Sequence, residues 1–283
     1  MVWPTGSTRL AGVIGDPVRH SLSPVLHNAA FSALGLDWAY LALPVPAGRA
    51  REALVGAAVL GVEGLSVTMP HKTAVAEALE RCSPTAARLR AVNTVVRRHD
   101  ELQGESTDGQ GFIDALRSEP GLDPAGHRCL IVGAGGAARA VVLALSQAGA
   151  REVVVVNRTP ERGRAAAALA GAAGRLGRPA EVETMDLVVN ATPVGMSNDD
   201  PGEPAAAPLL DANRLGPGQV LVDLVYHPTT TPLVELARRR GASAVNGVGM
   251  LVHQAALAFT LWTGEDAPLA AMRDAVTDVL QGD

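Results

Sequence analysis

Short apolar runs alternate with stretches of helical periodicity over the first third of the chain. Strands are expected at residues 10–15, 38–45 and 62–70, where Pro70 ends the last run. The periodicity predicts helices at residues 23–35 (ending at Gly35), 49–60 and 71–82. Because strand and helix follow one another repeatedly, we expect a parallel sheet.

A second series of strands and helices begins at Arg128. Residues 128–150 form an apolar run, a glycine turn and an Ala-rich stretch, which predict a strand followed by a helix. Further apolar strands are expected at residues 151–159, 185–196 and 219–226, and the chain from Asn246 onward is mainly helical in pattern. No repeat of solenoid length and no low-complexity linker interrupts the pattern.

Length and composition favour a two-domain globular protein. The 283 residues fit two domains at about 150 residues each. No apolar run is long enough to cross a bilayer, and residues 1–10 lack the basic and apolar segments of a secretory signal, so a cytoplasmic protein is expected. The net charge of −5 disfavours a nucleic-acid partner, and the short basic run Arg238–Arg240 is interpreted as the solvated end of a helix.

The two cysteines, Cys82 and Cys129, lie far apart and lack the spacing of a metal site. Neither a disulfide framework nor a bound metal is therefore expected. Both cysteines are interpreted as buried small apolar residues.

The strongest local motif is the G-x-G-x-x-A pattern of Gly133, Gly135 and Ala138, between an expected strand and an expected helix. Gly133 permits a tight turn, Gly135 lets the backbone approach a pyrophosphate, and Ala138 allows close packing of helix on strand. The helix N-terminus offers free N–H groups to an anion. The pattern predicts dinucleotide binding, although a glycine turn needed only for packing would have the same sequence.

The residues after the next strand indicate which dinucleotide binds. Asn157 lies 22 residues beyond Gly135 (157 − 135 = 22), where NAD proteins carry an acidic residue for the ribose 2′-hydroxyl. Arg158, Thr159 and Arg162 could instead bind a 2′-phosphate. The alternative is a pair of solvated arginines at a helix start, where the helix dipole disfavours them. This pattern favours NADP.

Other polar residues lie where strands or loops lead into helices, and each has an ordinary structural alternative. Ser21 and Ser23 precede a proline-started helix and could simply cap it. Lys72, after Thr68, could be a solvated side chain at a helix start. Asn93 in an apolar stretch and Asp108 on a glycine-rich loop could be turn residues.

Taken together and in order, these segments resemble the shikimate dehydrogenase family over almost the whole chain. The matching segments are "HSLSPVLHN", "VTMPHK", "AVNTV", "TDGQG", "GAGGAARA", "NRT", "NATPVGM", "DLVYHPTTTPL" and "NGVGMLVHQA". The resemblance implies an α/β fold with an N-terminal substrate domain, a Rossmann-type NADP-binding domain, and C-terminal helices that return to the first domain. It places the substrate domain at residues 1–108 with 247–283 and the NADP domain at residues 109–246. It further implies a role in aromatic amino acid biosynthesis through the chorismate pathway.

The same resemblance assigns roles to individual residues. Ser21 and Ser23 are expected to bind the carboxylate of shikimate, with Tyr226 nearby, and Lys72 is expected to be catalytic together with Asp108. The side chains expected to hold ring hydroxyls are Thr68, Asn93, Asp108 and Gln254. The residues expected to bind NADP are Gly133, Ala134, Gly135, Gly136, Ala137, Asn157, Arg158, Thr159, Arg162, Thr192, Leu224 and Gly247.

The assigned chemistry is the reversible oxidation of shikimate to 3-dehydroshikimate. As hydride leaves the carbon of a secondary alcohol, the hydroxyl proton must also leave, and the reverse reaction needs a proton donor. Lys72 and Asp108 would both bond that oxygen, and either could carry the proton.

Two positions depart from the family pattern, since Ser66 and Ser106 stand where asparagine is usual. A serine hydroxyl is shorter than an amide, and a water could fill the gap or the pocket could differ. Quinate and aminoshikimate are therefore alternative substrates, and a noncatalytic NADP-binding sensor is the alternative of another class. A monomer and a homodimer are both compatible with the sequence.

Overall fold

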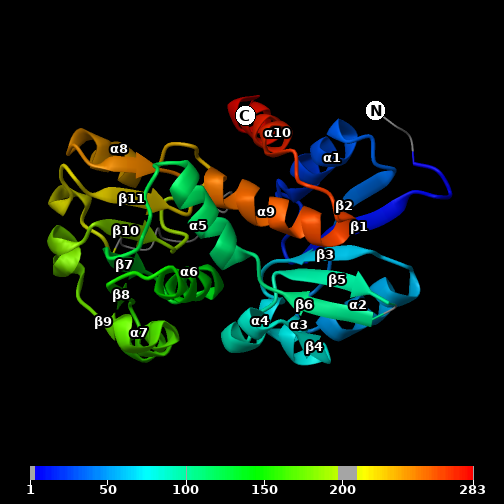
Figure 1. Ribbon diagram of the computed structural model, residues 1–283, viewed down its shortest axis with the longest axis horizontal. Coiled ribbons are helices and arrows are strands. Elements are labelled where there is room, and N and C mark those ends of the chain that lie inside the picture. Colours follow the sequence, from blue (N-terminus) through cyan, green and yellow to red (C-terminus); the bar gives the residue numbers. More distant parts are fainter. Residues whose placement is uncertain (1–3, 100, 197–208, 283) are drawn as a thin grey trace. The chain divides into compact units, whose positions relative to one another are not determined.

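The computed structural model describes residues 4–99, 101–196 and 209–282, and it divides into two compact units (Figure 1). One unit contains the chain up to Thr107 together with the chain from Val252 onward, and the other runs from Asp108 to Leu251. The long helix α9 (Val248–Thr263) begins in the second unit and continues in the first.

The first unit is built on a six-stranded sheet in the order β2-β1-β3-β5-β6-β4. Its strands are β1 (Arg9–Gly15), β2 (Trp38–Pro44), β3 (Gly64–Val67), β4 (Arg81–Cys82), β5 (Thr94–Arg98) and β6 (Glu101–Glu105). Strands β2, β1 and β3 are parallel, as expected, but β5 runs antiparallel to both β3 and β6. The expected parallel sheet is therefore confirmed for these three strands, and β5 and β6 are strands that the sequence analysis did not predict. A short turn can join β5 to β6 because antiparallel neighbours need no helical crossover.

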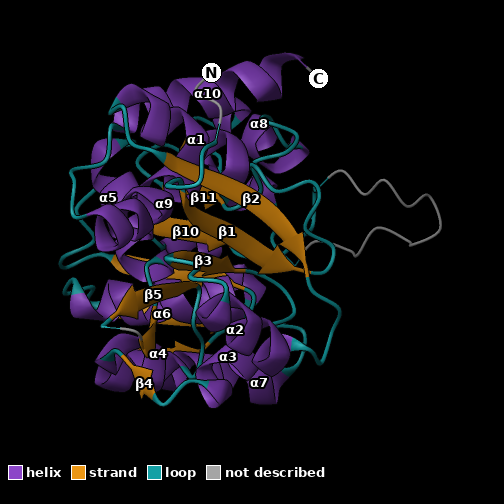
Figure 2. Ribbon diagram, turned by 90° about the vertical axis from the view of Figure 1, so that its right-hand side faces the viewer, coloured by secondary structure: helices purple, strands orange, loops and turns teal. Residues whose placement is uncertain are grey.

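Helices cover this sheet (Figure 2). They are α1 (Ser23–Ala33), α2 (Ala50–Val59), α3 (Lys72–Ala78), α4 (Pro84–Leu89), the later part of α9, and α10 (Leu269–Gly282), which packs on α1. The expected helix at residues 71–82 is too long, because the backbone becomes extended at Leu79 and β4 then pairs with β6. An apolar cluster that includes Leu54, Leu65 and Val75 joins α2 and α3 to the strands.

The second unit is built on a wholly parallel sheet in the order β12-β11-β10-β7-β8-β9. Its strands are β7 (Arg128–Val132), β8 (Glu152–Val156), β9 (Gly174–Leu176), β10 (Leu187–Asn190), β11 (Val220–Asp223) and β12 (Ser243–Val245). Its helices are α5 (Asp108–Ser118), α6 (Gly136–Gln147), α7 (Pro160–Ala167) and α8 (Pro232–Arg239), with short 3-10 helices η1 (Ala168–Ala173), η2 (Pro179–Thr184) and η3 (Ala212–Arg214). The chain leaves β7 in one direction and returns to the other side at β10, which is the doubly wound arrangement of nucleotide-binding domains. The expected α/β class with a Rossmann-type unit is confirmed.

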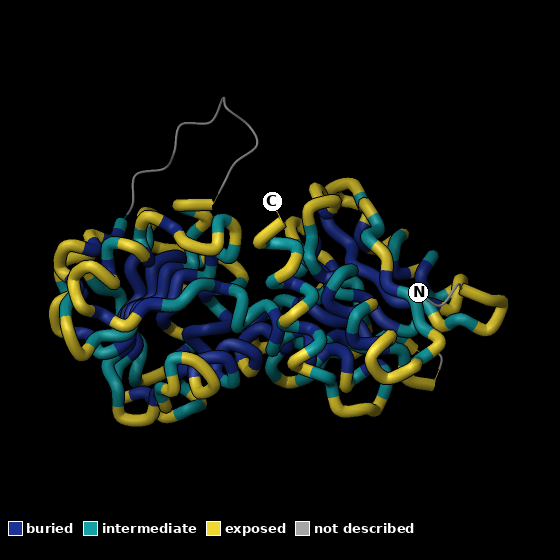
Figure 3. Tube along the Cα trace, turned by 90° about the horizontal axis from the view of Figure 1, so that it is seen from above, coloured by how far each residue is buried: buried dark blue, intermediate teal, exposed yellow. Residues whose placement is uncertain are grey.

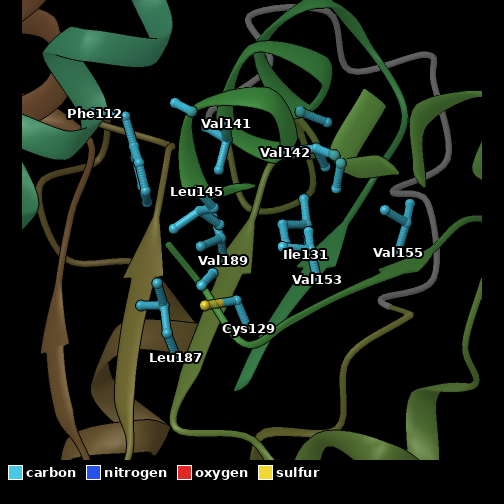
Figure 4. Packing of buried hydrophobic residues seen from close by; sticks show 14 of the residues in the cluster. Phe112, Cys129, Ile131, Val141, Val142, Leu145, Val153, Val155, Leu187 and Val189 are labelled. Atoms are coloured by element: carbon cyan, nitrogen blue, oxygen red, sulfur yellow. The ribbon is translucent and has the colours of Figure 1, made fainter. Parts of the chain in front are cut away.

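The core of the second unit lies between this sheet and its helices (Figure 4). Ile131, Val153 and Val189 from three adjacent strands are 0% exposed and pack in one cluster with Val141 and Leu145 of α6. Strands that are covered on both faces are apolar at almost every position, which explains the uninterrupted valine run of β8. Figure 3 shows buried chain, in dark blue, inside each unit and exposed chain, in yellow, at its surface.

The cysteine prediction is right for one residue and wrong for the other. Cys129 is fully buried, and burial raises the pKa of its thiol to about 12, whereas Cys82 is partly exposed because β4 lies at the sheet edge. Within the described residues, no group of three or more His, Cys, Asp or Glu side chains is placed to hold a metal ion. Among the helices described, none is long and apolar enough to span a membrane.

Candidate active site

One edge of the first sheet gathers three of the residues that the sequence singled out for the substrate, namely Thr68, Lys72 and Asn93. Strands β1, β3 and β6 end at this edge, and β5, which runs the other way, begins there. The backbone N–H of Val67 donates to Asn93 (2.7 Å), and that of Asn93 donates to Glu105 (3.1 Å). The segments that follow β3 and β6 therefore lie next to the segment that precedes β5.

Thr68 and Lys72 follow β3 at this edge. The Thr68 N–H donates to Ile14 at 3.0 Å, and a Cβ added to Gly15 would meet the Thr68 methyl group, so glycine is required beside it. Lys72 is the first residue of α3 and is half-buried. Its backbone carbonyl accepts from the Val92 N–H at 2.9 Å, which ties the start of α3 to the segment that carries Asn93.

Asn93 binds Thr107, a residue that the sequence analysis did not identify. The Asn93 Oδ1 accepts from the Thr107 backbone N–H, and the Asn93 Nδ2 donates to Thr107 Oγ1, both at 2.8 Å. The same Nδ2 lies 3.4 Å from Oε1 of Gln254 on α9. Both Asn93 and Thr107 are 5% exposed. The only sequence signal for Thr107 was its place directly before Asp108.

Asp108 lies on a helix and not on the glycine-rich loop that the sequence suggested. It is the first residue of α5, in the second unit, and its side chain is 7% exposed. The adjacent Gly109 serves helix packing, because a Cβ there would approach the Ala140 carbonyl oxygen of α6 to 2.9 Å. Since Lys72 belongs to the first unit, its meeting with Asp108 on one substrate oxygen stays a prediction.

The capping alternative for the two serines accounts for only one of them. The N-cap residue of α1 is Leu22, which has no side-chain capping bond, and Ser21 Oγ accepts from the Ser23 N–H at 3.2 Å. The Ser23 hydroxyl does not accept a bond from the start of the helix, and Ser23 is 8% exposed. Ser23 therefore has a hydroxyl that local helix structure does not require.

The glycine motif has the geometry that a pyrophosphate needs. Gly133 has φ +116°, and a Cβ there would lie 2.9 Å from the Ala191 carbonyl oxygen, so a turn with no side chain is required. At Gly135 an added Cβ would meet no protein atom within 4 Å among the described residues. Gly135 is the N-cap of α6 and offers no side-chain acceptor to the first N–H groups, while Ala138 is fully buried against the sheet. Ala134 lies in this turn, Gly136 and Ala137 are the first two residues of α6, and all three are exposed or half-buried.

Two cations lie beyond the end of β8. The Asn157 side chain donates to the Thr159 carbonyl at 2.8 Å, which shapes the turn into α7. Arg158 and Arg162 are exposed, and neither forms an ion pair with any residue that the structure describes. By contrast, Arg164 on the same helix is 3.6 Å from Glu161. Two exposed arginines that form no ion pair with a described residue, beside the second strand, suit a phosphate group.

A buried polar network joins the ends of β10 and β11, and the sequence analysis did not identify it. Asp223 is 0% exposed and accepts from Asn190 Nδ2 (2.9 Å), the Val225 N–H (3.2 Å) and Thr231 Oγ1 (2.6 Å). Burial raises the pKa of Asp223, although these donors lower it. The sequence signal that could have identified this network is a polar residue at the end of each apolar strand, Asn190 in β10 and Asp223 in β11.

The remaining site residues of the second unit surround this network. Thr192 donates through Oγ1 to Asn190 at 2.7 Å. A Cβ at Gly247 would meet the Leu224 carbonyl group, so these two residues are in direct backbone contact. Tyr226 is half-buried, and burial raises the pKa of its phenol.

Comparison with known protein families supports the resemblance over three segments of the chain. Residues 13–95 match the shikimate dehydrogenase substrate binding domain, residues 118–194 match shikimate / quinate 5-dehydrogenase, and residues 247–277 match the shikimate 5'-dehydrogenase C-terminal domain. The shikimate dehydrogenase (NADP(+)) of Methanopyrus kandleri is 48% identical, and the match covers 97% of each chain.

Two solved structures have the same fold over nearly their whole length. A shikimate dehydrogenase in complex with NADP+ superposes with a TM-score of 0.91 at 34% identity, covering 98% of each chain. The 5-ketofructose reductase of Gluconobacter sp. strain CHM43 superposes with a TM-score of 0.87 at 31% identity, covering 97% of this chain and all of the other. Since these relatives differ in their named substrates, the fold alone does not identify the substrate.

Proposed function

The chain belongs to the shikimate dehydrogenase family, and we propose that it catalyses the NADP-dependent, reversible oxidation of shikimate to 3-dehydroshikimate. The observation that carries this proposal is the sheet edge at which Thr68, Lys72 and Asn93 come together. It provides hydroxyl, ammonium and amide groups for a polyhydroxylated acid. The named activity of the Methanopyrus kandleri relative is consistent with it.

The substrate-binding residues are proposed from this edge. Ser21 and Ser23 would bind the carboxylate, with Tyr226 nearby. Thr68, Asn93, Asp108 and Gln254 would hold the ring hydroxyls. The bond between Asn93 and Gln254 supports a shared role, because it fixes one amide relative to the other before substrate binds.

Lys72 and Asp108 are proposed as the catalytic pair. In the oxidation, the C–H bond at the reacting carbon breaks with its electron pair leaving as hydride, the O–H proton passes to a protein group, and the C–O bond becomes C=O. The Asn93–Thr107 bonds fix the residue that directly precedes Asp108 at the edge of the first sheet. The bond from the Val92 N–H to the Lys72 carbonyl holds the start of α3 beside the residue that precedes Asn93.

NADP is proposed as the cofactor, and when bound it supplies the hydride acceptor. The open space at Gly135 and the uncapped start of α6 fit the pyrophosphate, while Arg158 and Arg162 fit a 2′-phosphate. Thr192, Leu224 and Gly247 lie on the loops after β10, β11 and β12 of the same sheet, where a parallel sheet of this topology binds its ligand.

We also propose that the substrate domain comprises residues 1–108 and 247–283 and that the NADP domain comprises residues 109–246. The Gly109 and Gly247 regions would then be the points at which the two domains connect. Location in the cytoplasm and a monomeric or homodimeric state stay predictions from the sequence.

A spectrophotometric assay tests the function directly. Purified protein with NADP+ should form NADPH when shikimate is added, faster than with quinate or aminoshikimate, and faster than with NAD+. Preference for quinate would indicate that Ser66 and Ser106 have changed the pocket. Absence of turnover with all three acids would favour the noncatalytic sensor, whereas robust turnover would exclude it.

A further inference from the structure

Three buried polar side chains in the first unit form a closed cycle of hydrogen bonds. Thr94 is 0% exposed, and Asn93 and Thr107 are each 5% exposed. Asn93 Nδ2 lies 2.8 Å from Thr107 Oγ1, Thr107 Oγ1 lies 3.3 Å from Thr94 Oγ1, and Thr94 Oγ1 lies 3.2 Å from Asn93 Oδ1. Of these three residues, only Asn93 is among those proposed above to bind substrate.

The chemistry of the groups gives this cycle a single direction. A backbone N–H can only donate, and that of Thr107 lies 2.8 Å from one atom of the Asn93 amide, so this atom is the oxygen. The Thr94 hydroxyl faces the same oxygen and must donate to it. Since a hydroxyl has one proton, Thr94 can offer only a lone pair to Thr107. The Thr107 hydroxyl therefore donates to Thr94 and keeps a lone pair for the Asn93 nitrogen.

This direction determines what Asn93 can offer to a ligand. The oxygen and nitrogen ends of an amide have nearly the same shape, so the hydrogen-bond partners decide where each end points. The Asn93 oxygen is held by two donors from Thr107 and Thr94, while its nitrogen lies 3.4 Å from Oε1 of Gln254 on α9. An amide nitrogen donates and does not accept. On the side of Gln254, Asn93 is therefore fixed as a donor.

The pairing of two antiparallel strands builds the cycle. Thr94 is the first residue of β5 and pairs with Glu105, the last residue of β6, and Thr107 lies just beyond that end. The two threonines thus approach Asn93 from different segments of the chain. In a chain of hydrogen bonds each bond polarises the next, so the two hydroxyls strengthen the hold on the amide together.

We propose that Thr94 and Thr107 are positioning residues for the substrate and that they act through Asn93. Their hydroxyls hold the amide so that Nδ2 donates to one ring hydroxyl of shikimate, which then directs its own proton at another group. The inference rests on the proposed function, because it takes Asn93 as a residue that binds a ring hydroxyl.

Calorimetric titration of shikimate into Thr94→Val and Thr94→Ser tests the cycle without depending on turnover. Valine keeps the shape of threonine and deletes the hydroxyl, whereas serine keeps the hydroxyl and deletes the methyl group. Thr94→Val should raise the Kd for shikimate about five- to tenfold, because the Thr107 proton is no longer directed away from Asn93. Thr94→Ser should bind shikimate as wild type does, although the lost methyl group lowers its melting temperature. Equal losses of affinity in both variants would show an effect of packing and would overturn the proposal.

A second variant and a double variant separate positioning from a general effect on the unit. Thr107→Val should raise the Kd at least as much as Thr94→Val, since it removes the acceptor of Nδ2 itself. In an Asn93→Ala background, Thr94→Val should change the Kd no further, because Thr94 acts through Asn93. An additional loss in that background would contradict the proposal. Thr277→Val, which deletes a hydroxyl that donates to the Arg273 carbonyl within α10, is the matched control and should leave shikimate binding unchanged.

Shikimate analogues that each lack one ring hydroxyl identify the group that Asn93 holds. With one of them, wild type and Thr94→Val should bind equally, because the bond that the cycle supports is absent. Weaker binding of every analogue by Thr94→Val would overturn the proposal. Equal affinity of wild type and Thr94→Val for shikimate would also overturn it and would leave the proposed function standing. Failure of the wild type to bind or oxidise shikimate would overturn both.

Discussion

The amide nitrogen of Asn190 donates to Oδ1 of Asp223 at 2.9 Å, and this bond links the ends of the adjacent strands β10 and β11. Asp223 Oδ2 accepts from Thr231, whose hydroxyl also accepts from the Val234 N–H at the start of α8. One carboxylate therefore fixes two strand ends and one helix start. The loops proposed to contact the nicotinamide half of NADP begin at this network.

Asp223→Ala should destabilise the protein by about 2–4 kcal/mol, because it leaves buried donors on Asn190 and Thr231 unsatisfied. The melting temperature should fall by roughly 5–10 °C, and the KM for NADP+ should rise. Asp223→Asn should have a smaller effect, since its Oδ1 can still accept from Asn190. Glu161→Ala, which removes an exposed carboxylate of the same unit, is the matched control for scanning calorimetry. A melting temperature of Asp223→Ala equal to that of Glu161→Ala would contradict the assigned role.

His27 should make stability depend on pH below neutrality. It is fully buried, and burial lowers its pKa from 6.5 to about 3, so the folded protein keeps it neutral. The unfolded chain binds this proton at higher pH than the folded protein does. The His27 contribution is therefore fully present above pH 6.5 and is lost progressively as pH falls toward 3.

The contribution of His27 to the free energy of unfolding should fall by about 2 kcal/mol between pH 8 and pH 5. Urea unfolding of wild type and His27→Phe at several pH values measures it. The difference in unfolding free energy between the two proteins should shift in favour of His27→Phe as pH falls. A difference that is independent of pH would show that His27 does not titrate in this way.

Much of the fold could be predicted from the sequence, because local patterns specify it. The apolar runs of β7, β8 and β10 and the turn at Gly133 are local signals, and all were recognised. The antiparallel β5 and β6 were missed because strand direction depends on pairing between Thr94 and Glu105, which no local pattern encodes. Asp108 was assigned to a loop because Gly109 and Gly111 suggested one, although Gly109 in fact permits contact with α6.

The site was predictable only in part, for a similar reason. Ser23, Lys72 and Asn93 lie in sequence motifs, whereas Thr107 and Asp223 are defined by hydrogen-bond partners from distant segments.

Gly135→Ala should separate cofactor binding from folding. An added methyl group would meet no described protein atom within 4 Å, and φ at Gly135 is −75°, so the folded state should tolerate alanine. The same methyl group would occupy the space proposed for the pyrophosphate. The KM for NADP+ should rise at least tenfold while the melting temperature stays close to that of wild type. Unchanged cofactor affinity would place the pyrophosphate elsewhere.

Arg158→Ala should change the choice of cofactor. Loss of a charge-assisted bond to the 2′-phosphate should raise the KM for NADP+ by roughly 10–100-fold and leave the KM for NAD+ unchanged. The effect should shrink at high salt, because the site is exposed. Arg151→Ala, which removes an exposed arginine just before β8, is the control. Equal losses with both cofactors would argue against recognition of the 2′-phosphate.

Lys72→Ala should lower kcat for shikimate oxidation at least about a hundredfold, because proton transfer to or from the substrate oxygen loses its donor. The affinity for NADP+, measured by fluorescence titration, should be largely intact, since the proposed cofactor residues lie in the second unit and Lys72 in the first. Alanine at position 72 retains the backbone carbonyl that accepts from the Val92 N–H, and a melting temperature close to that of wild type would show that the variant is folded. A kcat within threefold of wild type would remove Lys72 from the catalytic pair and would leave Asp108 as the group to test next.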